Sequence, residues 1–142
     1  MARIISIDYG RVRCGLAATD TLQIIANGLT TVSTNKLMDF LRDYIAREPV
    51  ECIVVGLPKQ SDNTDSENMR YVNDFVKQLR RQMPDMKVEL YDERFTSVMA
   101  HRTMIDAGLG RMARRNKALV DEISATIILQ SYLESKKYNT KL

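Results

Sequence analysis

Hydrophobic and polar positions follow strand-like spacing in the first part of the chain. Residues 3–8 and 13–19 are short apolar runs, and residues 28–32 form a third, so three strands are predicted. Only short polar turns separate these runs, which is typical of antiparallel neighbours. The start of the chain is therefore expected to form an antiparallel meander.

Helical spacing dominates the middle of the chain. One predicted helix begins after Thr34 or Asn35, either of which can cap it, and ends before Pro49. A second amphipathic run stops at Pro84. Between the two helices, residues 51–56 are apolar without alternation, as expected for a strand that is buried on both faces.

One more strand and two more helices complete the predicted order. The strand covers 87–91, one helix lies between 96 and 108, and the last helix runs from about 119 to 134. The tail 136–138 is expected to fray. This order predicts an α/β fold in which one mixed five-stranded sheet carries helices on both faces, in a single domain over residues 1–142.

The composition agrees with a globular protein that has no membrane span. Hydrophobic residues make up 44% and charged residues 27% of the 142 residues, and no apolar run is long enough to cross a bilayer. The chain enters its first predicted strand at once, which leaves no room for a signal peptide and favours the cytoplasm. Cys14 and Cys52 lie in apolar runs without metal-ligand spacing, so both are expected to be buried free thiols.

Positive charge is concentrated in one segment near the end of the chain. The net charge is only +3, yet four basic residues occur between Gly108 and Leu119 without a compensating acid: Arg111, Arg114, Arg115 and Lys117. Such a segment can be a solvated surface loop. Its position just before Asp121 favours binding to phosphates.

Candidate functional carboxylates lie at the ends of two predicted strands and in the last predicted helix. Asp8 ends the first strand, Asp92 and Glu93 end the last strand, and Asp121 lies in the last helix. An unpaired carboxylate is costly to bury, so each must be solvated, paired with a cation or bound to a metal. Three such positions on separate elements favour a metal site.

Each carboxylate also has a simpler explanation. Asp8 can form an Asx-turn that leads into a glycine, and Glu93 can pair with Arg94 on the surface. Asp121 can be stabilised by the macrodipole if it lies in the first turn of its helix. However, Asp121 shares a helical stripe with Ala125, a small residue that lets a helix approach a sheet closely.

Four segments resemble, in order, the motifs of the RuvX family, also called YqgF. They are DYGRVRCGLA at 8–17, VGLP at 55–58, DERFT at 92–96 and the segment 117–125. The resemblance implies a ribonuclease H-like fold and RuvC-like nuclease activity. The family is described both as Holliday junction resolvases and as pre-16S rRNA nucleases.

The resemblance implies a divalent-metal-dependent endonuclease, a hydrolase that processes the 5′ end of pre-16S rRNA in ribosome biogenesis. Two alternatives stay open: a Holliday junction resolvase acting in DNA recombination and repair, and a non-catalytic RNA-binding factor on the same fold. An actin-like ATPase, which also opens with a strand and an Asp-x-Gly loop, needs two related domains, and the chain is too short for both.

The expected cofactor is a pair of Mg²⁺ or Mn²⁺ ions, since two ions about 4 Å apart activate water and stabilise the leaving oxygen. Asp8 is the expected bridging ligand, and Glu93 and Asp121 complete the two sites. Asp92 is the alternative to Glu93, because adjacent residues of a strand point to opposite faces.

Arginines beside these acids are expected to hold the substrate. Guanidinium groups can bind phosphates through two parallel hydrogen bonds, and the candidates near the predicted metal ions are Arg11, Arg13 and Arg94. The four basic residues between 111 and 117 are expected to hold a neighbouring segment of the substrate's backbone. His101, the one histidine, is expected on a helix surface. The resemblance implies nucleic acid as the partner, RNA or branched DNA, and the chain is expected to act as a monomer or a homodimer.

Overall fold

The computed structural model describes residues 1–57, 65–92 and 117–140, in which five strands form one sheet with the order β3-β2-β1-β4-β5. The strands are β1 (Arg3–Asp8), β2 (Arg13–Thr19), β3 (Ala26–Ser33), β4 (Val50–Leu57) and β5 (Lys87–Asp92). β1, β2 and β3 pair antiparallel, whereas β4 pairs parallel with both β1 and β5. The predicted meander and the mixed five-stranded sheet are confirmed.

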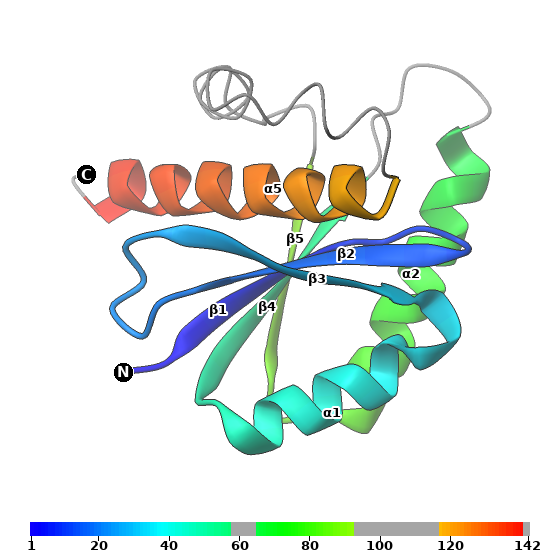
Figure 1. Ribbon diagram of the computed structural model, residues 1–142, viewed down its shortest axis with the longest axis horizontal. Helices are drawn as coiled ribbons and strands as arrows, with labels where there is room; N and C mark the ends of the chain where they lie inside the picture. The colour runs from blue at the N-terminus through cyan, green and yellow to red at the C-terminus, as the bar shows by residue number, and fades with distance from the viewer. Residues whose placement is uncertain (58–64, 93–116, 141–142) are drawn as a thin grey trace.

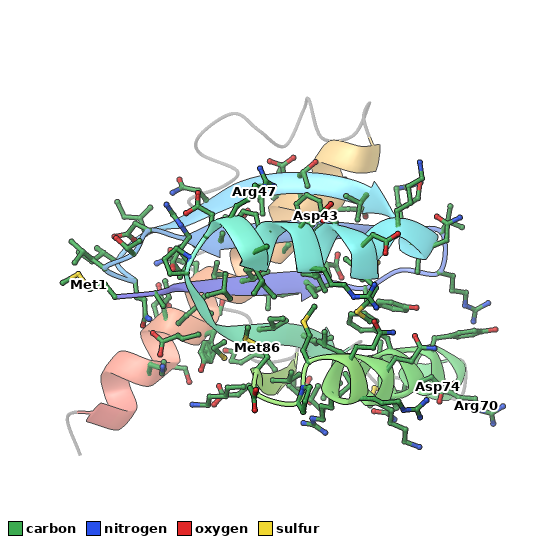
Figure 2. All side chains as sticks on the ribbon, turned by 90° about the horizontal axis from the view of Figure 1, so that it is seen from below. Met1, Asp43, Arg47, Arg70, Asp74 and Met86 are labelled. Atoms are coloured by element: carbon green, nitrogen blue, oxygen red, sulfur yellow. The ribbon has the colours of Figure 1, made fainter. Side chains whose placement is uncertain are left out.

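Helices cover both faces of this sheet, as predicted (Figure 1). The helical elements are a 3₁₀ turn (Thr34–Lys36), α1 (Leu37–Arg47), α2 (Asp65–Gln82) and α5 (Lys117–Thr140). α5 crosses one face, here called the α5 face, while α1 and α2 lie side by side on the other, the α1/α2 face (Figure 2). No helix within these ranges is long and apolar enough to cross a membrane. The helix predicted between 96 and 108 lies outside the described residues.

Two separate apolar clusters hold the layers together. On the α1/α2 face, the strands contribute mainly Ile and Leu side chains, and on the α5 face they contribute smaller residues such as Ala17. Residues 52–55 of β4 alternate between the two clusters and are all buried, which confirms the strand predicted to be buried on both faces. Cys14 belongs to one cluster and Cys52 to the other, and both are the buried free thiols that were predicted.

The predicted cap of the first helix is wrong. Neither Thr34 nor Asn35 caps α1, whose N-cap is Lys36 without a side-chain hydrogen bond. The hydroxyl of Thr34 instead donates to the carbonyl oxygen of Gly10, 2.7 Å away. A threonine hydroxyl can satisfy either a helix end or a nearby carbonyl, and here it ties the start of α1 to the β1–β2 loop.

The last helix is longer at both ends than predicted. It begins at Lys117 and continues to Thr140, so it includes residues 136–138, the tail that was expected to fray. Lys136 lies one turn after Tyr132, and its ammonium is 5.5 Å from the centroid of the tyrosine ring. This cation–π contact helps to extend the helix beyond its apolar stripe.

Candidate catalytic site

Asp8 lies at the end of β1, on the side of the sheet that α5 covers. Ile4 packs in the α5-face cluster, and the hydroxyl of Ser6 donates to the carbonyl oxygen of Ala125 in α5, 2.6 Å away. Because side chains alternate along a strand, Asp8 follows Ile4 and Ser6 on the α5 face. Its carboxylate is therefore on the same side of the sheet as α5.

Gly15 brings the start of α5 down onto the sheet beside Asp8. It is the direct partner of Asp8 in the β1–β2 register. A Cβ at Gly15 would overlap the backbone carbonyl group of Asp121, so only glycine permits this approach. Asp8 and Asp121, from opposite ends of the chain, are thereby brought together over one residue of β2.

Arg13 binds the carboxylate of Asp121. Its Nε donates to Oδ2 of Asp121 at 2.5 Å, and the two side chains are 38% and 24% exposed. Arg13 was expected to contact the substrate, and in this structure its guanidinium holds one of the two carboxylates in place. A charged hydrogen bond of this kind fixes the direction of both groups.

The macrodipole does not explain Asp121. α5 begins at Lys117, so its first turn ends before Asp121 and contains no acidic residue. The favourable effect of the dipole falls off within that turn. Asp121 owes its position to the small-residue stripe instead, because Ala125, one turn further on, is fully buried against the sheet.

The thiol of Cys14 packs on the α1/α2 face of β2, and both carboxylates affect its pKa from the other face. Burial raises the pKa of Cys14, and the charges of Asp8 and Asp121 raise it further, against the hydrogen bonds to Thr34 and Gly10 that lower it. Both carboxylates therefore act on the same buried atom.

The end of β5 gives the face of the sheet to which Asp92 points. Tyr91 packs against the α5-face cluster, with its ring centroid 6.3 Å from that of Tyr132 in α5. Since neighbours in a strand point to opposite faces, Asp92 points to the α1/α2 face, away from Asp8. This alternation argues against Asp92 as a ligand beside Asp8, and Glu93 lies outside the described residues.

Several other predicted residues also fall outside the part of the chain that the structure describes: Arg94, His101, Arg111, Arg114 and Arg115. Lys117 is the first residue of α5, and its side chain is not described. Among the described residues, no three His, Cys, Asp or Glu side chains gather closely enough to hold a metal ion. The predicted third ligand is not part of that set.

Two residues of the β1–β2 loop bind aromatic rings of α2. Tyr9 stacks on Phe75 with 4.8 Å between ring centroids, and the guanidinium of Arg11 lies 4.5 Å from the centroid of Tyr71. Sequence reasoning missed Tyr71. The signal was its place beside Val72, just off the apolar stripe of the helix, where an aromatic residue is left exposed.

Comparison with known proteins gives a consistent result along the chain. Residues 2–135 match the family model RuvX, described as Holliday junction resolvase. A protein of Phocaeicola vulgatus is 65% identical over 97% of this chain and 99% of its own length, and one of Flavobacterium johnsoniae is 55% identical over 97% and 100%. Both carry the name "Putative pre-16S rRNA nuclease".

Solved structures with low sequence identity share the fold. RuvC of T. thermophilus, solved in complex with a Holliday junction substrate, is 15% identical with a TM-score of 0.59, covering 96% of each chain. The fowlpox virus Holliday junction resolvase is 16% identical with a TM-score of 0.52, covering 94% of this chain and 98% of its own. The expected ribonuclease H-like fold is confirmed.

Proposed function

This chain belongs to the RuvX family, and we propose that it is a divalent-metal-dependent endonuclease that processes the 5′ end of pre-16S rRNA in the cytoplasm. One structural observation carries the catalytic part of the proposal: Gly15 lets Asp121 reach the strand position that is paired with Asp8. The names of the relatives support the choice of RNA.

The residues present fit a hard divalent cation. Carboxylate oxygens are the ligands that Mg²⁺ and Mn²⁺ prefer, and Asp8 and Asp121 come together on the α5 face of the sheet at Gly15. We assign both residues as ligands, together with Glu93. When bound, a pair of such ions would activate a water molecule and stabilise the charge of the leaving oxygen.

The chain's own cations would orient the strand that is cut. Arg13 holds the carboxylate of Asp121 and lies beside it at the start of β2. Arg11 is exposed in the loop that follows Asp8, where a guanidinium can bind a backbone phosphate. Arg94 and the basic segment from Arg111 to Lys117 are proposed to bind further phosphates, because positive charge along a strand supplies affinity without reading its sequence.

The proposal is tested by two matched substitutions, Asp8→Asn and Asp92→Asn. Cleavage of an RNA that carries the 5′ end of pre-16S rRNA is measured with Mg²⁺ and with Mn²⁺. Loss of a residue that only orients a metal ligand typically costs roughly 10–100-fold in activity. Asp8→Asn removes a proposed ligand itself, so it should lower the rate by more than that. Asp92→Asn removes the same charge from the opposite face and should cleave nearly as the parent does. Near-normal activity of Asp8→Asn would refute the assignment.

A Holliday junction resolvase is the second candidate, favoured by the description of the matching family and by the shared fold with RuvC. Resolution of a junction needs two active sites, so a homodimer is expected for this activity and a monomer suffices for RNA. Cleavage of a labelled four-way DNA junction in the same assay, with the mass of the protein in solution, separates the two. Metal-independent binding without cleavage of either substrate would favour a non-catalytic RNA-binding factor.

A further inference from the structure

Tyr71 is the most exposed aromatic side chain that the structure describes. It is 41% exposed, whereas Phe75, one turn later on α2, is only 6% exposed. An aromatic ring at the surface of a helix contributes little to the core. The exposed ring of Tyr71 can meet a ligand from solution.

A cation lies on this ring. The guanidinium of Arg11 is 4.5 Å from the centroid of Tyr71, and Arg11 is also exposed. Aromatic rings and arginine planes are the two kinds of side chain on which proteins stack unpaired bases. The pair offers both in one place, together with a positive charge for the adjoining phosphate.

The pair lies close to the carboxylates along the chain. Arg11 follows Asp8 by three residues, which limits the separation of their Cα atoms to about 11 Å. The β1–β2 loop lies at the same end of the sheet as the start of α5 (Figure 1), and its residues Tyr9 and Arg11 contact α2. A strand bound at Asp8 and Asp121 can therefore continue over the loop towards α2.

The contact is not needed to attach the loop to the helix. Tyr9 already stacks on the buried ring of Phe75, and the hydroxyl of Thr34 binds the carbonyl group of Gly10 in the same loop. Since Tyr9, Gly10 and Arg11 are consecutive, the loop is held on two sides without Tyr71. The contact between Arg11 and Tyr71 is thus not required to hold the loop, and it can serve a ligand.

We propose that Tyr71 and Arg11 form a stacking platform for one unpaired base of the nucleic-acid strand that is cleaved. This inference rests on the proposed function and deepens it, because it assigns a single-stranded segment next to the site of hydrolysis. It predicts that bases as well as phosphates contribute to affinity. The platform tolerates any base, since every base presents a π-face.

The absence of tryptophan from the chain allows a direct test. Tyr71→Trp places a single indole at the platform, and its emission reports only this position. A single-stranded RNA should quench this emission on binding. The same strand with abasic sugars, and a fully paired RNA duplex, should bind without quenching.

Removal of the Tyr71 ring should show how much of the binding affinity comes from bases and how much from phosphates. Tyr71→Leu should weaken binding of the base-carrying strand by roughly fivefold to a hundredfold, which corresponds to the loss of one stacked base. Affinity for the abasic strand should not change. The control is Leu22→Ala, which alters a 56% exposed side chain in the β2–β3 hairpin, at the other end of β2. This variant should bind both strands as the parent does.

The outcomes distinguish this inference from the function on which it rests. Equal losses for both strands, or none, would show that Tyr71 only packs the loop, and the platform would be refuted while cleavage by the parent stands. Tight RNA binding by Tyr71→Trp without quenching of its indole emission would refute it as well. If the parent binds no nucleic acid, the platform and the proposed function fail together.

Discussion

The two faces of the sheet are packed by different means. On the α1/α2 face, large aliphatic side chains such as Leu16 and Leu41 are fully buried, and helix and sheet are separated by those side chains. On the α5 face, Gly15 and Ala17 let the helix backbone lie almost directly on the strands. Polar groups take part there, since the hydroxyl of Ser6 donates to a carbonyl oxygen of α5.

This difference separates stability from chemistry. A layer of large aliphatic side chains excludes water and supplies most of the apolar area that is buried. A layer of small residues brings two backbones together, so that carboxylates on each can meet at its edge. The α1/α2 face should therefore respond most to the loss of volume, and the α5 face to the addition of volume.

The largest effect on stability is expected from Leu41→Ala. Leu41 is fully buried in the α1/α2-face cluster, so its truncation should lower the free energy of unfolding by about 2–5 kcal/mol. Urea denaturation measures the change. The two thiols report where the structure loosens, because burial raises the pKa of both Cys14 and Cys52 and so keeps each of them slow to alkylate.

In native conditions, Leu41→Ala should speed alkylation of Cys14, which shares its cluster, more than that of Cys52 on the other face. Equal acceleration of both thiols would mean that the variant opens only by global unfolding. A loss of less than about 1 kcal/mol would contradict the idea that this face carries the stability.

A smaller loss is expected when volume is added on the α5 face. Gly15→Ala places a methyl group against the rigid backbone of Asp121 and should cost about 1–3 kcal/mol. Because α5 must shift, cleavage should fall as well. Gly28→Ala is the matched control, since the atoms nearest to its methyl group belong to the flexible side chain of Glu122. If both variants lower the free energy of unfolding by the same amount, the close approach of α5 at Gly15 is not what makes Gly15→Ala destabilising.

The spacing of apolar residues along the sequence predicted the strands and helices that pack through their side chains. The strands 3–8 and 13–19 were predicted at their observed bounds, because a strand buried against a layer repeats its apolar residues visibly. The end of α5 was missed because the period reports only packed faces, whereas backbone hydrogen bonds continue the helix through polar residues to Thr140.

The spacing of apolar residues could not predict the contacts that are made by the backbone or by small residues. Nothing in the sequence shows which carbonyl group lies over Gly15, since that depends on the register of β1 with β2 and on the start of α5. Thr34 was assigned to the wrong partner for a similar reason, because the carbonyl group of Gly10 comes near only in the fold. The third ligand, Glu93, stays a prediction.

The smallest effect on stability, and the sharpest test of the α5 face as a site of binding, is expected from Arg13→Gln. The ion pair with Asp121 is partly exposed, so its loss should change the free energy of unfolding by no more than about 1 kcal/mol. If Arg13 also binds a phosphate, the dependence of log affinity on log salt should become shallower by about 0.7–0.9.

Arg3→Gln is a matched control at the other end of β1. Nε of Arg3 lies 3.3 Å from Oε2 of Glu48, in a pair of similar exposure, and Arg3 also donates to the carbonyl oxygen of Thr19. Its removal should cost at least as much stability and leave the salt dependence of RNA binding unchanged. An unchanged slope for Arg13→Gln would limit Arg13 to positioning Asp121. Phosphate binding would then fall to Arg11 and to the basic residues beyond it.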